Sequence, residues 1–155
     1  MAATADPSGI IVPCPACGQR NRLRYSSIDK PPRCARCKNP LPAPGEPVEV
    51  TSAQVFDALV AQSALPVLVD FWADWCGPCR MVAPEITKVA TSRAGALIVA
   101  KVDTEALTDV AGRWRIQSLP TIALFSQGRE IDRLVGARPA TDILAFVEQH
   151  APTLL

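Results

Sequence analysis

Apolar residues in the last two-thirds of the chain fall into two kinds of run. Residues 66–73 (PVLVDFWA) and 96–102 (ALIVAKV) are nearly continuous apolar stretches, which are typical of strands buried on both faces. Around them, apolar positions recur at helical spacing in segments that start near residues 52, 76, 105 and 140. Thr51 or Ser52 can cap the first of these helices. Buried strands of this kind need helices to cover them.

The order of these elements predicts the fold class. Residues 121–125 and 130–136 flank a turn signal, so they should form a hairpin after the two buried strands. The second helix should run from about Cys76 to Ser92, with a kink at Pro84. The order helix, strand, helix, strand, helix, strand, strand, helix predicts an α/β sandwich around a mixed sheet of about four strands.

The first third of the chain differs from the rest. Residues 1–39 contain no apolar periodicity able to form a core, so something other than burial must hold them. Residues 40–47 (PLPAPGEP) contain four prolines, which favour extended backbone and resist helix and sheet alike. We therefore predict a small module at 1–39, a proline-rich linker at 40–47 and an α/β domain at 48–155.

Composition excludes several classes of function. With 16 basic and 15 acidic residues among 155, the net charge of +1 gives no whole-protein argument for nucleic acid or an anionic membrane. The eight glycines never occur as Gly-x-Gly and no Gly-Lys-Ser/Thr is present, so we expect no nicotinamide or flavin cofactor. The first residues lack the features of a secretory signal, and no apolar run approaches the roughly 18 residues of a membrane span. We therefore expect a cytoplasmic protein.

The six cysteines form three C-x-x-C pairs, and one pair lies where a buried strand meets a helix. Backbone N–H groups and the macrodipole at a helix N-terminus stabilise an anion, so the thiol pKa of Cys76 should fall. Cys79 follows one turn later and can lie beside Cys76 but deeper, which is the arrangement of a reversible dithiol. The alternative is half of a metal site, for which residues 48–155 offer no other cysteine.

These residues resemble a known family. The run VLVDFWADWCGPCRMVAP, followed by SLPT at 118–121 and VGA at 135–137, is similar to thioredoxin over about residues 51–150. The resemblance implies the thioredoxin fold and a protein-disulfide reductase. Cys76 would attack a disulfide in a client protein, Cys79 would resolve the mixed disulfide, and thioredoxin reductase would recharge the protein.

Asp70 stands inside an apolar strand, where a carboxylate without partners is expensive and its pKa should be raised. It could instead bond to the backbone or pair with a lysine. The resemblance implies a buried acid that deprotonates the resolving thiol of Cys79, and it implies that Lys101 is the partner of this acid.

The resemblance also implies a client-binding surface around Cys76. Pro120 matches the cis-proline of the family, and the Leu119 backbone would pair with an extended client peptide. The rim of this surface would be completed by Trp75, Gly77, Pro78 and Gly136.

The other four cysteines have the spacing of a zinc site. Cys14 and Cys17 are separated by 16 residues from Cys34 and Cys37, and tetrahedral Zn²⁺ would fix a segment without a core of its own. Two disulfides or free thiols are the alternative. A thioredoxin with such an extension resembles the bacterial thioredoxin 2 type, which implies one structural or regulatory Zn²⁺ per chain.

The role of this module stays open at this point. Residues 14–38 include seven basic and one acidic residue, and a zinc tetrathiolate would leave about +4. Only Tyr25 could stack on a base, so we favour a solvated face or a protein-docking surface over nucleic acid. One alternative makes the module a nucleic-acid or partner-binding unit with the thioredoxin domain as scaffold or redox sensor. Another has oxidation of the four thiols eject zinc and change activity. We expect a monomer.

Overall fold

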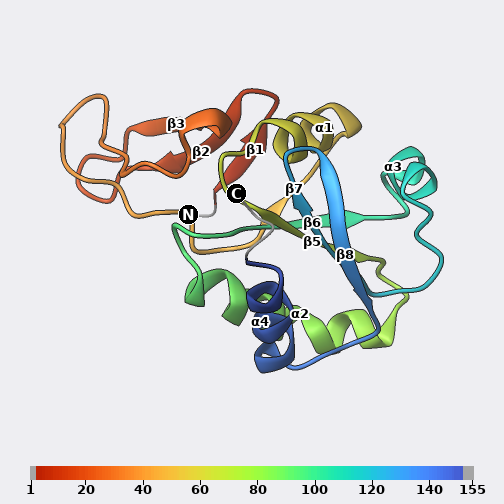
Figure 1. Ribbon diagram of the computed structural model, residues 1–155. Helices are drawn as coiled ribbons and strands as arrows, with labels where there is room; N and C mark the ends of the chain where they lie inside the picture. The colour runs from red at the N-terminus through yellow and green to blue at the C-terminus, as the bar shows by residue number, and fades with distance from the viewer. Residues whose placement is uncertain (1–2, 152–155) are drawn as a thin grey trace.

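A computed structural model describes residues 3–151 and contains two β-sheets (Figure 1). The first is a three-stranded antiparallel sheet of β1 (Thr4–Asp6), β2 (Gly9–Pro13) and β3 (Arg20–Arg24), followed by a short 3-10 helix, η1 (Tyr25–Ser27). The second is a five-stranded mixed sheet in the order β4-β6-β5-β7-β8.

The five-stranded sheet is the centre of an α/β fold. Its strands are β4 (Val48–Glu49), β5 (Val67–Trp72), β6 (Ile98–Asp103), β7 (Thr121–Ser126) and β8 (Arg129–Val135). Strands β4, β6 and β5 are parallel, whereas β7 is antiparallel to β5 and forms a hairpin with β8. The helices are α1 (Ala53–Gln62), α2 (Gly77–Ser92), α3 (Thr108–Arg113) and α4 (Ala140–Gln149). Figure 1 shows α2 and α4 on one side of this sheet and α1 on the other.

Two apolar clusters divide the faces of the sheet. Val67, Val69 and Phe71 of β5 pack with α1 and α3, whereas Leu68 packs with α2 and α4. Successive side chains of a strand point to opposite faces, so the even-numbered positions of β5 lie under α2. This alternation decides which polar residues can reach the start of α2.

The α/β prediction is confirmed, with one strand more than expected. The Ser52 hydroxyl accepts a hydrogen bond from the Val55 backbone N–H at 3.1 Å and caps α1, as predicted. The sequence pattern does not reveal strand β4, because a strand of two residues is too short to show alternation. It exists because β6 offers a free edge, to which β4 pairs in parallel.

The expectation that burial does not hold the N-terminal segment is wrong. Ile10 and Tyr25 are 0% and 1% exposed, and they belong to the same apolar cluster as Phe56 and Leu59 of α1. Each short strand contributes only one or two buried residues, so no single stretch shows a period. The core is completed by the helix that packs against the module.

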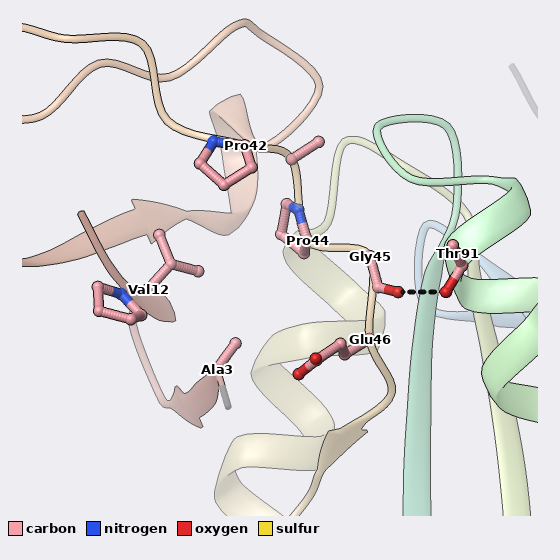
Figure 2. Close-up of a pocket in the computed structure, with 9 residues that line it drawn as sticks. Ala3, Val12, Pro42, Pro44, Gly45, Glu46 and Thr91 are labelled. Atoms are coloured by element: carbon pink, nitrogen blue, oxygen red, sulfur yellow. Dashed lines mark hydrogen bonds between the residues drawn. The ribbon is translucent and has the colours of Figure 1, made fainter. Parts of the chain in front are cut away.

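Residues 40–47 contain no helix and no sheet strand, as their prolines predict, but they are packed against the rest of the protein. Leu41 and Pro44 are buried. The Thr91 hydroxyl, near the end of α2, donates a hydrogen bond of 3.1 Å to the Gly45 carbonyl (Figure 2). A groove of about 350 Å³ lies beside this connection, between Val12 of β2 and Thr91. Residues 40–47 therefore contact both the N-terminal strands and the end of α2.

Candidate dithiol and metal sites

Cys76 and Cys79 form a disulfide at the start of α2. Cys76 is the N-cap residue of the helix, and its Sγ accepts a hydrogen bond from the Cys79 backbone N–H at 3.1 Å. Cys76 and Cys79 are 3% and 4% exposed, so both are buried in the disulfide form. A thiolate on Cys76 would keep this backbone donor and the positive end of the helix dipole.

Asp70 lies on the face of β5 that α2 covers, two residues before Trp72. It is 1% exposed, and neither carboxyl oxygen has a hydrogen-bond partner in the part of the chain that the structure describes. The alternative that Asp70 bonds to the backbone is therefore wrong. Burial raises the pKa of Asp70 to about 7, although the positive charge of Lys101 opposes this shift.

Lys101 is the neighbour of Asp70 across the sheet. The two residues are register partners in the parallel pair of β5 and β6. The Lys101 ammonium lies 5.2 Å from the centroid of the Trp72 ring, which is within the range of a cation–π interaction. A cavity of about 130 Å³ is lined by Trp72, Cys79 and Lys101. It has room for water molecules beside the second cysteine and Lys101.

The expected client-binding residues come from the first turn of α2, which also contains Cys79, and from the loops before α2, before β7 and after β8. The Leu119–Pro120 peptide bond is cis, and the Pro120 carbonyl accepts a hydrogen bond of 2.9 Å from the Gly136 backbone N–H. Gly77 and Pro78 are exposed, and Trp75 is 67% exposed, a large value for an indole ring. An exposed aromatic ring beside a reactive pair is suited to contact a protein partner.

A groove of about 300 Å³ extends from Trp75 and Leu119 toward α3. Sequence reasoning missed the other residues that line it, which come from three separate segments: Thr104, Glu105, Thr108, Ala111, Ile116 and Gln117. No single motif connects them, so only the fold reveals that they share a surface with Trp75.

The four N-terminal cysteines meet at one point. Their sulfur atoms all lie within 4.8 Å of one another, with 3.6 Å between Cys14 and Cys37 and 3.6 Å between Cys17 and Cys34. A tetrahedral zinc site with Zn–S bonds of about 2.3 Å places sulfurs roughly 3.8 Å apart, so this donor set fits Zn²⁺. Among residues 3–151 it is the only group of this kind with three or more possible ligands.

The two C-x-x-C segments each form a backbone turn of the same kind. Gly18 N–H donates to the Cys14 carbonyl at 2.8 Å, and Lys38 N–H donates to the Cys34 carbonyl at 3.0 Å. Gly18 has φ 79° and Lys38 has φ 67°, so the lysine takes a left-handed conformation that normally favours glycine.

Asn21 joins the two turns and was not singled out from the sequence. Its Oδ1 accepts a hydrogen bond from the Ala35 backbone N–H at 2.9 Å, and its Nδ2 donates to the Gln19 carbonyl at 3.0 Å. It is 6% exposed, in agreement with the rule that buried polar groups are hydrogen-bonded. An asparagine between the two C-x-x-C pairs is the signal that could have identified it.

The dithiol and the cysteine cluster lie apart. In Figure 1 the loops of the N-terminal module are on the left, whereas α2 begins on the right, beyond the ends of β5 and β6. The module therefore does not cover the surface around Cys76. Within residues 3–151, no helix combines the length and apolar character that crossing a membrane requires.

The sequence profile described as thioredoxin matches residues 47–149. The chain belongs to the thioredoxin family. It is 35% identical over 141 residues to thioredoxin C-3 of Corynebacterium nephridii, covering 91% of this chain and 95% of that protein. It is 42% identical over 110 residues to the bifunctional thioredoxin reductase/thioredoxin of Mycobacterium leprae, covering 71% of this chain and 24% of that protein.

Solved structures agree with this assignment. The thioredoxin of Malassezia sympodialis (Mala s 13) superposes with a TM-score of 0.63 at 33% identity, covering 70% of this chain and 93% of that one. The domain thus has the thioredoxin fold, and the protein is a thiol-disulfide oxidoreductase of the protein-disulfide reductase class.

Proposed function

We propose that Cys76 and Cys79 transfer two electrons to disulfides in client proteins. The Cys76 thiolate attacks a client disulfide, which breaks that bond, forms a mixed disulfide and releases one client thiolate, which takes up a proton. Cys79 then loses its proton and attacks the Cys76 sulfur. The mixed disulfide breaks, the second client thiolate leaves, and the Cys76–Cys79 disulfide forms. The observation that supports this most directly is the disulfide at the N-terminus of α2 beside exposed Trp75.

Asp70 accepts the proton of Cys79 in this proposal, and Lys101 is the electrostatic partner of Asp70. A base with a pKa of about 7 is ionised in half of the molecules at neutral pH, so it can accept and release a proton without a large energetic cost. The cavity that Cys79 shares with Trp72 and Lys101 provides a route through water.

Clients would bind across the surface around Cys76. An extended client segment could pair with the Leu119 backbone, and an apolar side chain beside the client disulfide could enter the groove next to Trp75. We infer that Gly77, Pro78, Pro120 and Gly136 keep this surface flat enough for a protein client.

We propose that thioredoxin reductase recharges the dithiol. A relative from Mycobacterium leprae is named as a bifunctional thioredoxin reductase/thioredoxin, so the two activities are combined in one chain there. The absence of Gly-x-Gly loops from this sequence is consistent with electrons that come from a separate flavoprotein.

A reductase-coupled assay of insulin reduction tests the proposal. Cys76→Ser should abolish turnover, and Cys79→Ser should accumulate a mixed disulfide that non-reducing gels and mass spectrometry detect. Met81→Ala is the matched control, because Met81 is 72% exposed near the start of α2 and has no assigned role. Insulin reduction at the wild-type rate by Cys76→Ser would refute the dithiol mechanism.

We also propose that Cys14, Cys17, Cys34 and Cys37 hold one Zn²⁺ per chain, with 1–39 as the zinc module, 40–47 as its linker and 48–155 as the thioredoxin domain. Bound zinc would cross-link the two turns and supply folding energy. Thiols that bind zinc must stay reduced, which favours the cytoplasm as the compartment, and we expect a monomer there. Metal analysis should find one zinc, and thiol titration of the reduced, native protein should find two accessible thiols.

A second function, the binding of an acidic protein partner, is supported by a pocket in the zinc module. This pocket of about 330 Å³ combines four cationic residues with an apolar floor that includes Leu23 and Ile28; the cations are Arg22, Arg24, Lys30 and Arg33. Tyr25 is 1% exposed and donates its hydroxyl to the Asp6 carbonyl, so it is not available to stack on a base. These features favour an acidic peptide over single-stranded nucleic acid.

Binding of a poly-glutamate peptide, compared with a single-stranded oligonucleotide of equal charge, tests this second function. Arg24→Glu should weaken peptide binding about tenfold, the effect expected from reversing one charge in a shallow pocket. Arg20→Glu, on the same strand but outside the pocket, is the matched control and should change it much less. Equal effects of the two variants, or tighter binding of the oligonucleotide, would contradict the assignment.

A further inference from the structure

Three charged residues form a row across the three parallel strands of the main sheet. Lys101 of β6 is the register partner of Asp70 on β5 and also of Glu49 on β4. Register partners point to the same face of a sheet, so all three side chains lie on the face that α2 covers. Val48 and Val50, on either side of Glu49, belong to the cluster on the opposite face, which agrees with this orientation.

One lysine therefore stands between two acids in this row. We propose that Glu49 is a positioning residue for the dithiol reaction, and that it acts on Asp70 by sharing the ammonium of Lys101. Neither the dithiol motif nor the cis-proline loop includes Glu49, which stands on the edge strand that the sequence pattern did not reveal. The inference rests on the proposed role of Asp70 as proton acceptor.

The electrostatics agree with this geometry. The negative charge of Glu49 contributes to the raised pKa of Asp70, although burial is the larger cause and Lys101 opposes both. The pKa of Glu49 is itself raised, first by burial and then by the charge of Asp103, while Lys101 lowers it. Without the Glu49 carboxylate to offset the positive charge of Lys101, the pKa of Asp70 would be lower.

Apart from burial, the charges of this row are the main influence on the ionisation of Asp70. Asp103 is the register partner of Trp72, one pair further along the strands, and the adjacent β7 contains no charged residue. From α2, Cys79 and Arg80 line the neighbouring cavity, but Arg80 is exposed and donates to the Asp74 carbonyl. Lys101 itself stands on the strand between the two acids, and its ammonium lies over the Trp72 ring.

The experiment compares Glu49→Gln with wild type in the reduced, full-length protein. The titration midpoint of Asp70 is read from its carboxyl ¹³C chemical shift, and the rate of mixed-disulfide resolution is measured as a function of pH. Removing a unit charge about two strand spacings away should lower the midpoint by about half a pH unit, because Glu49 is only partly buried and solvent screens its charge. The acid limb of the rate profile should move to lower pH by the same amount, because Asp70 is then ionised at lower pH.

Glu46→Gln is the matched control, because Glu46 is an exposed acid on the linker just before β4 and lies outside the row. It should move neither the midpoint nor the rate profile. In a Lys101→Met background, Glu49→Gln should shift the midpoint by less than in wild type, since no ammonium is left to share.

The failures of the two proposals are distinguishable. A midpoint of Asp70 that does not move in Glu49→Gln would overturn the role of Glu49 while leaving the role of Asp70 intact. A midpoint that moves without any change in the rate profile would overturn the role of Asp70 as proton acceptor, and with it the role of Glu49 in the reaction.

Discussion

At the scale of single residues, Asp70 is the group whose environment differs most from that of a surface side chain. It is 1% exposed, its carboxyl oxygens have no hydrogen-bond partner among residues 3–151, and Lys101 is its neighbour across the sheet. An ionised carboxylate in this position costs free energy, so the folded protein holds the proton more tightly than the unfolded chain does.

The free energy of unfolding should therefore fall as pH rises from about 4 to about 7. The folded pKa of Asp70 is about 7 against an ordinary value of 3.8, and at about 1.4 kcal/mol per pH unit this amounts to roughly 4 kcal/mol. Asp70→Asn removes the titration, so the variant should be more stable than wild type by a few kcal/mol at pH 8 and similar at pH 4.

Urea unfolding at several pH values measures this difference. Asp29→Asn, which changes an exposed acid, should keep the pH dependence of the wild type. If Asp70→Asn kept that dependence as well, the ionisation of Asp70 would not be coupled to stability.

At the scale of elements, each of the two cysteine turns needs one residue with positive φ. The first turn has Gly18, which takes φ 79° without strain, whereas the second has Lys38 at φ 67°. Left-handed backbone costs an ordinary residue roughly 1 kcal/mol, so the second turn stores strain that the first does not.

Lys38→Gly should raise the stability of the zinc-loaded protein by about 1 kcal/mol, because glycine removes this strain. Lys38→Ala is the control, because it also loses the hydrogen bond from Nζ to the Ala35 carbonyl but keeps a Cβ. Thermal unfolding should rank the glycine variant above the alanine variant. Because both variants lose the side-chain hydrogen bond, the reverse order would mean that the backbone at residue 38 is not strained.

At the scale of the whole molecule, the N-terminal strands and the thioredoxin fold share one apolar cluster. Tyr25 is the link between them: its hydroxyl donates to the Asp6 carbonyl at 2.7 Å, and its own carbonyl accepts from the Ala64 N–H at 2.9 Å. Ile10 and Tyr25 pack in the same cluster as Phe56 of α1. A shared core makes the stability of each part depend on the other.

Zinc removal should therefore lower the melting temperature of the whole chain in a single transition. Calorimetry of the zinc-loaded protein, with and without a strong chelator, measures this effect. Tyr25→Phe, which leaves the Asp6 carbonyl without its donor, should cost about 1–2 kcal/mol in the same transition. Two transitions, of which the upper one is insensitive to the chelator, would show that the module unfolds independently.

Much of this protein was determined by its sequence alone. Runs of apolar residues predict β5, β6 and the helices because their periodicity is a local property, and C-x-x-C pairs are recognisable because the spacing of reactive groups is local as well. The raised pKa of Asp70 follows from one acid within an apolar strand, and the structure agrees with it.

Only the tertiary structure decided the rest. The edge strand with Glu49, the buried side of the N-terminal sheet and the groove beside Trp75 each combine residues that are far apart in the chain. Strands of two to five residues bury too few side chains to show a pattern. Whether Glu49 and Asp70 both stand beside Lys101 depends on which strands become neighbours. Strand pairing is a long-range choice, made by the packing of the whole chain.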